Sequence, residues 1–213
     1  MKKISLLILT CLSMFSLNAA EISGNFALTN DYIWRGMSQT GEDFVYSGGV
    51  DVSAENNGSY IGVWGSKVDF GADDDTNMEV DVYFGYSDES ARGVSFDVGY
   101  ISYSYPGSSE LNFEEIYFGF GFKLLGLNFA QGLDGAPDNM EMSLALGESG
   151  FSFTYGEYDD YGKYEMLSYD FPVQIANRVS VGIGLSNFDS EDGMADEDGF
   201  VITFSMWSNL DKN

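Results

Sequence analysis

The stretch MEVDVYFGYS, residues 78–87, alternates strictly between two kinds of side chain. One set is apolar and comprises Met78, Val80, Val82, Phe84 and Tyr86. The other set is acidic, polar or small and comprises Glu79, Asp81, Tyr83, Gly85 and Ser87. Successive side chains of a β-strand point to opposite faces, so this period of two predicts a strand with one apolar and one polar face.

The same alternation recurs along most of the chain. It is clearest at residues 94–100, 115–123, 140–147, 179–185 and 200–206. Together with more mixed runs it gives about twelve strands of ~9–11 residues, the length of a tilted strand that crosses a bilayer. No amphipathic helix is expected. The chain is therefore predicted to be all-β.

Two all-β architectures fit this pattern, a soluble sandwich and a transmembrane barrel whose apolar face meets lipid. The connecting segments favour the barrel. Alternate connections are longer and richer in acid, as in GADDDT (71–76) and DSEDGMADED (189–198), whereas those between them are short. This asymmetry is typical of outer-membrane barrels, and Tyr100, Tyr103 and Tyr105 resemble an interfacial aromatic girdle. We predict an antiparallel up-and-down transmembrane β-barrel of about twelve strands.

The first residues have the layout of a secretory signal. Lys2 and Lys3 precede a mostly apolar run over residues 4–15, and small residues follow it. We therefore expect a signal peptide over residues 1–19 and a single barrel domain over residues 20–213. Cys11 is the one cysteine and lies in this signal, so no disulfide is expected in the mature chain.

Composition excludes several classes of function. The formal net charge of −25 argues against nucleic acid as a partner and favours cations or neutral molecules. The chain has no histidine, so a Ser-His triad and a His-ligated zinc site are unavailable. No catalytic residue, cofactor or metal site is predicted, and the protein is not expected to be an enzyme. The acid clusters 73–75 and 196–198 match no EF-hand loop, so a solvated rim that attracts cations is favoured over a calcium site.

Several motifs occur in an order that resembles a known family. They are TNDYIWRGMSQT, YIGVWGSKVDF, MEVDVYFGYS, DVGYISYSYPG and FEEIYFGFGF. In these motifs the chain is similar to the TorF-type porins, a Gram-negative outer-membrane family. The resemblance implies an outer-membrane barrel with a pore, and it implies no substrate or residue role. The chain departs from such barrels by ending SMWSNLDKN rather than on an aromatic residue. Trp207 would then serve as the signal for the barrel-assembly machinery, or assembly is less standard.

In a barrel, the polar faces of the strands line the lumen. The predicted pore-lining residues are Arg35, Asp51, Glu79, Asp81, Asp97, Glu115, Lys123 and Glu141. Arg35 belongs to the segment TNDYIWRGMSQTGED, residues 29–43. A guanidinium can hold a carboxylate bidentately, so Arg35 would pin this segment across the lumen with Tyr32 and Trp34 against the wall. Alternatively, Tyr32 and Trp34 are interface anchors and Arg35 balances nearby acids.

The sequence thus predicts an outer-membrane, porin-like channel for passive passage of small solutes, with cations preferred. Its expected partners are outer-membrane lipid, small solutes or cations, and the barrel-assembly machinery. Two alternatives remain open. One is a secreted or periplasmic β-sandwich that binds carbohydrate or calcium, and the other is a plugged barrel with a structural or adhesive role.

Overall fold

A computed structural model describes residues 20–54, 58–71, 76–172, 179–191, 193 and 195–209. The expected signal peptide, residues 1–19, lies outside these ranges and stays a prediction. In the part of the chain that is described, no helix is long and apolar enough to cross a membrane.

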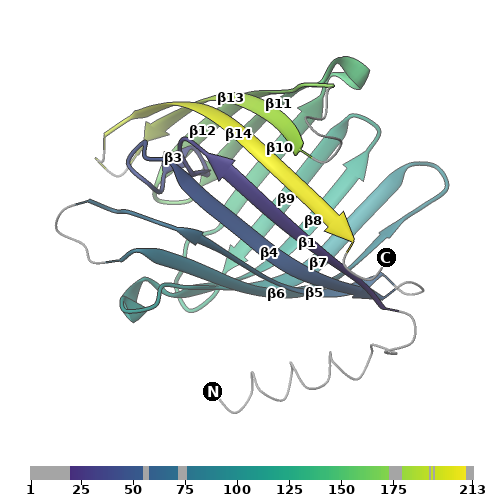
Figure 1. The fold of residues 1–213 in the computed structure, drawn as a ribbon, viewed down its shortest axis with the longest axis horizontal. Coiled ribbons are helices and arrows are strands. Elements are labelled where there is room, and N and C mark those ends of the chain that lie inside the picture. Colours follow the sequence, from purple (N-terminus) through teal and green to yellow (C-terminus); the bar gives the residue numbers. More distant parts are fainter. Residues whose placement is uncertain are drawn as a thin grey trace, which may run out of the picture.

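The described residues form a closed antiparallel barrel of twelve strands (Figure 1). The barrel strands are β1 (Ala20–Thr29), β4 (Val45–Ala54), β5 (Ser59–Lys67), β6 (Met78–Glu89), β7 (Val94–Ser104), β8 (Phe113–Phe122), β9 (Leu125–Gly132), β10 (Asn139–Ala145), β11 (Phe151–Tyr158), β12 (Gly162–Asp170), β13 (Val179–Ser190) and β14 (Glu197–Asn209). Each strand pairs with its neighbours in chain order, and β1 closes the barrel by pairing with both β4 and β14. The predicted up-and-down barrel is confirmed, and the sandwich alternative is wrong because its two open sheets are absent from the described strands.

The connections gather at two ends of the barrel. At one, the hairpin end, the strands are joined by segments 30–44, 68–77, 105–112, 133–138, 159–161 and 191–196. At the other, the turn end, they are joined by segments 55–58, 90–93, 123–124, 146–150 and 171–178. Segment 105–112 contains the short 3-10 helix η1 (Ser109–Leu111), and segment 146–150 contains η2 (Gly147–Ser149). On average the connections at the hairpin end are longer, as the sequence predicts.

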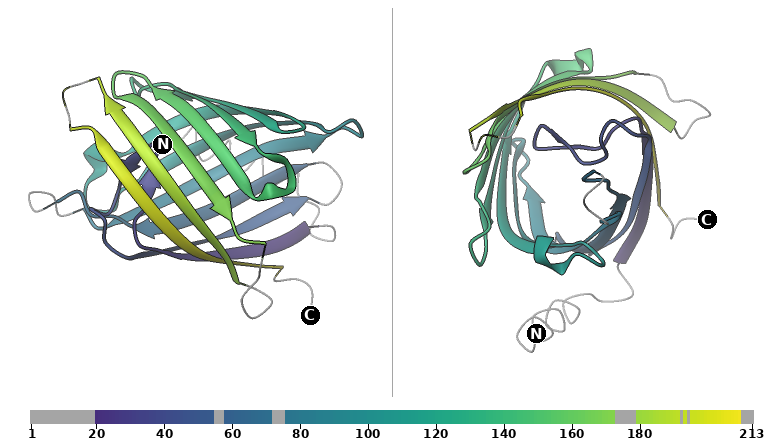
Figure 2. Two further views of the ribbon diagram at one scale, coloured as in Figure 1. Left: turned by 90° about the horizontal axis from the view of Figure 1, so that it is seen from above. Right: turned by 90° about the vertical axis from the view of Figure 1, so that its left-hand side faces the viewer.

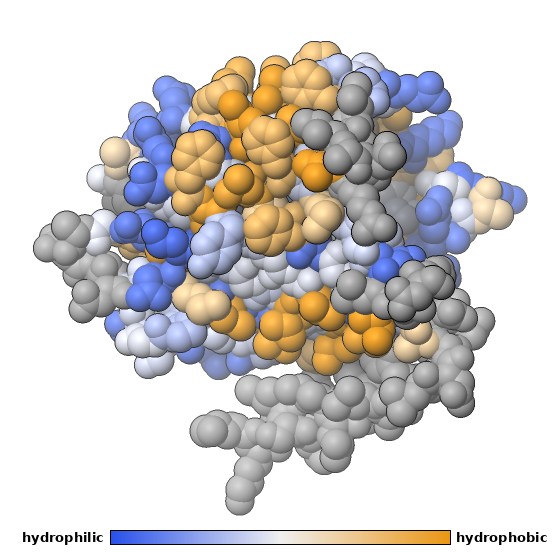
Figure 3. Space-filling model, in the orientation of Figure 1, coloured by the Kyte–Doolittle hydropathy of each residue, from blue (hydrophilic) through white to orange (hydrophobic). Residues whose placement is uncertain are grey.

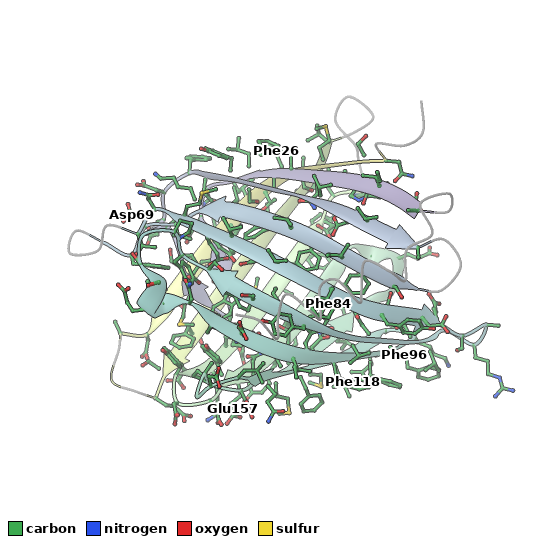
Figure 4. All side chains as sticks on the ribbon, turned by 90° about the horizontal axis from the view of Figure 1, so that it is seen from below. Phe26, Asp69, Phe84, Phe96, Phe118 and Glu157 are labelled. Atoms are coloured by element: carbon green, nitrogen blue, oxygen red, sulfur yellow. The ribbon has the colours of Figure 1, made fainter. Side chains whose placement is uncertain are left out.

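The outward face of the wall is apolar. Phe26 and Phe118, on opposite sides of the barrel in Figure 4, are 47% and 46% exposed and point away from it. The visible face in Figure 3 carries apolar side chains over its middle and hydrophilic residues toward the two ends. Near the turn end, outward aromatic pairs such as Tyr86 with Phe96 pack 5.8 Å apart between ring centroids. An apolar belt with aromatic residues at its edge is the surface that lipid requires.

Candidate functional site

The first long connection folds back into the barrel. Its two short strands, β2 (Ile33–Trp34) and β3 (Met37–Ser38), form a hairpin that lies inside the ring of strands in the right-hand view of Figure 2. The turn residues Arg35 and Gly36 have φ values of 49° and 84°. Positive φ at both central residues is the requirement of a tight two-residue hairpin, which explains a glycine at the second position.

The tip of this hairpin contacts the part of the barrel wall formed by β12 and β13. A Cβ atom at Gly36 would lie 2.5 Å from Cβ of Tyr164 on β12 and 3.2 Å from Cβ of Phe188 on β13. Both of these wall residues are 1% exposed. The approach is therefore closer than any side chain larger than hydrogen allows, and glycine is needed at position 36 for space as well as for backbone conformation.

Arg35 binds a carboxylate on another strand of the wall, β8. Its Nη1 and Nη2 atoms each donate to a different oxygen of Glu115 on β8, both at 2.8 Å. The two side chains are 9% and 1% exposed. The guanidinium carbon also lies 4.2 Å from the ring centroid of Trp34 and 4.6 Å from that of Tyr158. Burial alone would lower the pKa of Arg35, but the hydrogen bonds and charge of Glu115 outweigh it and raise that pKa, so Arg35 stays charged.

The base of the hairpin is held by a compact set of polar contacts. Asp31 accepts hydrogen bonds from the hydroxyls of Ser38 (2.7 Å) and Thr40 (2.8 Å). The backbone N–H of Ser38 donates to Glu197 on β14 (2.8 Å), and that of Asp69 donates to the carbonyl of Gln39 (2.8 Å). The hairpin is thus tied to its own stem, to β14 and to the connection after β5.

Aromatic rings fill the space around the ion pair. Trp34 packs against Tyr103, Phe113 and Tyr158 at centroid distances of 5.9, 6.0 and 5.4 Å. Val68, Tyr103 and Tyr105 form a buried apolar cluster with Tyr32 and Trp34 against it. The sequence-based assignment of Tyr103 and Tyr105 to an interfacial girdle is therefore wrong, because both point into the lumen. Trp34 likewise packs inside the barrel rather than at a lipid interface.

Tyrosine hydroxyls donate to most of the predicted lumen carboxylates. On Glu79 they come from Tyr32 (2.9 Å) and Tyr105 (2.7 Å), one to each oxygen. The other pairs are Tyr60 with Asp97 (2.6 Å), Tyr83 with Asp51, Tyr103 with Glu115 (3.3 Å) and Tyr164 with Glu141 (3.0 Å). These partners compensate the carboxylates for the loss of water. The sequence analysis placed Tyr83 on the polar face but assigned it no role, although a tyrosine on that face is the feature that could have indicated one.

Asp81 differs from the other lumen carboxylates. It lies on β6 opposite Tyr103 in register and is 5% exposed. Its Oδ1 atom has no hydrogen-bond partner among the described residues. A buried carboxyl oxygen without a partner is costly, so Asp81 is the least well compensated of these lumen residues.

The prediction that Lys123 lines the lumen is wrong. It lies in the two-residue turn between β8 and β9, with φ of 56°, and is exposed. Its Nζ atom sits 5.0 Å from the ring centroid of Phe122. Lys123 therefore lies beyond the strands at the turn end and does not line the lumen, because the strand alternation stops one residue before it.

One cavity lies at the hairpin end and another near the turn end. The larger, at the hairpin end, has a volume of about 1340 Å³. We call it the vestibule. Among its described lining residues are nine carboxylates and no lysine or arginine. The smaller cavity, about 520 Å³, opens near the turn end beside small residues such as Gly119, Gly121 and Ser95.

The acid clusters do not form a metal centre in the described part of the chain. No group of three or more His, Cys, Asp or Glu side chains there has the arrangement of a metal site. Asp196, Glu197 and Asp198 line the vestibule, and each accepts a hydrogen bond from the protein. The cluster 73–75 lies outside the described residues.

Residues 16–191 match the family Gcw_chp, described as a bacterial protein of unknown function. The TorF-type resemblance stays a prediction. No curated protein sequence matches the chain.

Solved structures with a similar fold share little sequence with this chain. One, described as "Unveiling the Mechanism Behind the in-meso Crystallization of Membrane Proteins", is 8% identical with a TM-score of 0.57, covering 91% of this chain and 85% of that chain. Pseudomonas aeruginosa OprD is 12% identical with a TM-score of 0.42, over 90% of this chain and 67% of OprD. The COG4313 outer membrane channel from Pseudomonas putida F1 is 10% identical with a TM-score of 0.36, over 92% and 97%. At these identities the first likeness shows the barrel fold alone.

Proposed function

We propose that this chain, which belongs to the Gcw_chp family of bacterial proteins, is an outer-membrane channel that passes small solutes and favours cations. The observation that carries this proposal is the charge of the path. The six carboxylates predicted from the sequence lie on inward strand faces, and the vestibule adds nine carboxylate residues, Glu114 among them, without a described lysine or arginine. Confined negative charge stabilises an entering cation and excludes an anion.

The size of the barrel fits a narrow channel. Barrels of ~8 strands are filled by side chains and those of ~16 leave a wide bore, so twelve strands leave room for a constricted path. Here the hairpin supplies the constriction. A solute entering from the vestibule meets the plane of Trp34, Arg35 and Gly36 before it reaches the smaller cavity. The bore of the channel would therefore depend on where the hairpin lies.

The location and partners of the protein belong to the same proposal. The apolar outward belt suits outer-membrane lipid. The long, acidic hairpin end would face the outside of the cell and the short turn end the periplasm. Trp207, near the end of β14, would be read by the barrel-assembly machinery.

Reversal potentials in planar bilayers test the channel. Purified full-length protein in a KCl gradient is expected to give a potential that favours K⁺. Asp97→Asn, on the inward face, should reduce this preference, whereas the matched change Glu157→Gln, whose residue pairs with outward Met140 in register, should leave it unchanged. A preference for Cl⁻ in wild-type protein would contradict the proposal.

A second candidate function is favoured by the packing at the hairpin end. Glu79, Asp81 and Glu115 are at most 5% exposed, so that half of the lumen resembles a protein core. A barrel closed in this way would serve as a structural or adhesive protein. Absence of channel activity in folded protein, with and without the hairpin contacts, would make it the better account.

A further inference from the structure

The wall site that holds Arg35 has the features of a binding site for a guanidinium group. It is built by residues of three strands, Tyr103 on β7, Glu115 on β8 and Tyr158 on β11. Glu115 accepts two parallel hydrogen bonds at 2.8 Å each, and the face of Tyr158 lies 4.6 Å from the guanidinium carbon. A planar fork of N–H donors that also stacks on a ring is the group this geometry selects, and a spherical ion does not reproduce it.

The site also contains more carboxyl groups than the one that Arg35 pairs with. Glu79, Asp81 and Glu115 lie close together on β6 and β8 and are all at least nine-tenths buried. Glu79 and Glu115 are fully hydrogen-bonded, but Asp81 keeps an oxygen without a partner among the described residues. One guanidinium balances one of these three carboxylates. Glu115 is therefore the carboxylate that attracts a cation to this wall when Arg35 is removed.

We propose that this wall site binds solutes that carry a guanidinium group, and that Arg35 occupies it as a tethered equivalent of such a solute. The inference rests on the proposed channel function and names the class of solute that its constriction prefers. A tethered group competes at an effective concentration in the millimolar range, so free solute binds weakly until Arg35 is displaced. Displacement breaks the central contact of the hairpin, which couples binding to opening of the constriction.

Removing the tethered group makes the site measurable without any transport. Arg35→Ala leaves Tyr103, Glu115 and Tyr158 in place whether the hairpin stays or moves, because all three belong to barrel strands. Isothermal titration calorimetry of this variant in detergent would use methylguanidinium as the probe. Tetramethylammonium, a cation without N–H donors, is the control for attraction to the acidic vestibule. Heat-modifiable migration on gels verifies that each variant is folded.

We expect R35A to bind methylguanidinium several-fold more tightly than the wild type does, and more tightly than tetramethylammonium. Adding Glu115→Gln should weaken methylguanidinium binding by about tenfold or more, since a charge-assisted bidentate pair is lost. Adding Glu114→Gln instead removes the same charge from the adjacent vestibule residue and should change binding little.

The outcomes separate this inference from the channel proposal. Equal binding of the two cations, or equal effects of Glu115→Gln and Glu114→Gln, would overturn the guanidinium site even if the protein conducts K⁺. Site-specific binding in R35A would support the inference even if wild-type protein were silent in bilayers, in which case the channel proposal alone would fail.

Discussion

The two halves of the lumen use the same chemistry but differ in burial. In the half toward the hairpin end, Glu79 and Glu115 are 3% and 1% exposed, and aromatic rings fill the space around them. In the half toward the turn end, Asp51 and Asp97 are only partly buried, and Asp97 lines a cavity of about 520 Å³. Tyrosine hydroxyls donate to the carboxylates in both halves.

The difference in burial between the two halves comes from one connecting segment, residues 30–44. The wall by itself is a polar tube, and tyrosine hydroxyls donate to most of its carboxylates. The hairpin β2–β3 adds the Trp34 ring, the turn at Gly36 and the cation Arg35 to the half toward the hairpin end. It leaves the half toward the turn end open. The comparison teaches that the wall sets the charge of the lumen, while the hairpin sets its bore.

The largest expected effect comes from removing the cation. Arg35→Ala leaves Glu115 buried without its ion pair, which costs about 3–5 kcal/mol as long as the hairpin keeps its place. The hairpin is expected to leave the lumen and let water reach Glu115, so conductance and cation preference should both rise. Single-channel conductance and reversal potential measure these changes.

Arg35→Lys is the matched control. It keeps the charge but loses the bidentate fork, so it should give an intermediate conductance. Unchanged conductance in Arg35→Ala would show that the hairpin does not set the bore.

A charge placed on the outside of the same wall should have the next largest effect. Val82 lies on the outward face of β6, between Asp81 and Tyr83 and thus where the two halves meet. Val82→Arg should cost about 2–4 kcal/mol near the bilayer midplane. Asp81→Asn, on the inward face next to it, should be neutral or stabilising, because it removes a buried carboxylate with an unpartnered oxygen. Urea unfolding in lipid vesicles measures both, and the opposite ranking would reverse the assignment of the faces.

The contact of the hairpin tip with the far wall gives a smaller effect. Gly36→Ala places a Cβ atom against Tyr164, in addition to its unfavourable positive φ of 84°. The expected cost in unfolding free energy is about 1–3 kcal/mol. Gly41→Ala is the control, because its φ is 59° but nothing lies within 4 Å of its Cβ position, and its cost should not exceed about 1 kcal/mol. Equal costs would mean that the tip does not press on the wall.

The smallest expected effect comes from removing one tyrosine hydroxyl in each half of the lumen. Tyr105→Phe removes a donor from buried Glu79 and should cost about 1–2 kcal/mol, since water cannot readily replace it. Tyr83→Phe removes the donor to Asp51, which is only partly buried, and should cost less because water takes its place. Parallel urea titrations in one detergent compare the variants. A larger cost for Tyr83→Phe would contradict the difference in burial on which the comparison depends.

Much of the wall follows from short-range pattern. The alternation at residues 78–87 correctly assigns Val82 and Phe84 to the outward face and Glu79 and Asp81 to the inward face. The same reasoning failed at Lys123, which ends the pattern in a turn. It also failed at Tyr103, on the inward face of β7, and at Tyr105, which directly follows that strand. Aromatic residues suit lipid interfaces and packed lumens alike, so their type alone does not choose the side.

The sequence by itself determined that twelve alternating strands close into a wall with an apolar outside and an acidic inside, because a period of two is fixed by backbone geometry. It also pointed to a bidentate contact of Arg35 with a lumen carboxylate. Which carboxylate this is, and that the hairpin lies inside the barrel, were decided by tertiary structure. Arg35 and Glu115 are 80 residues apart, and they meet because strand register brings β8 beneath the hairpin while Gly36 fits against Tyr164 and Phe188. Contacts of this kind depend on closure of the whole barrel, and no local pattern specifies them.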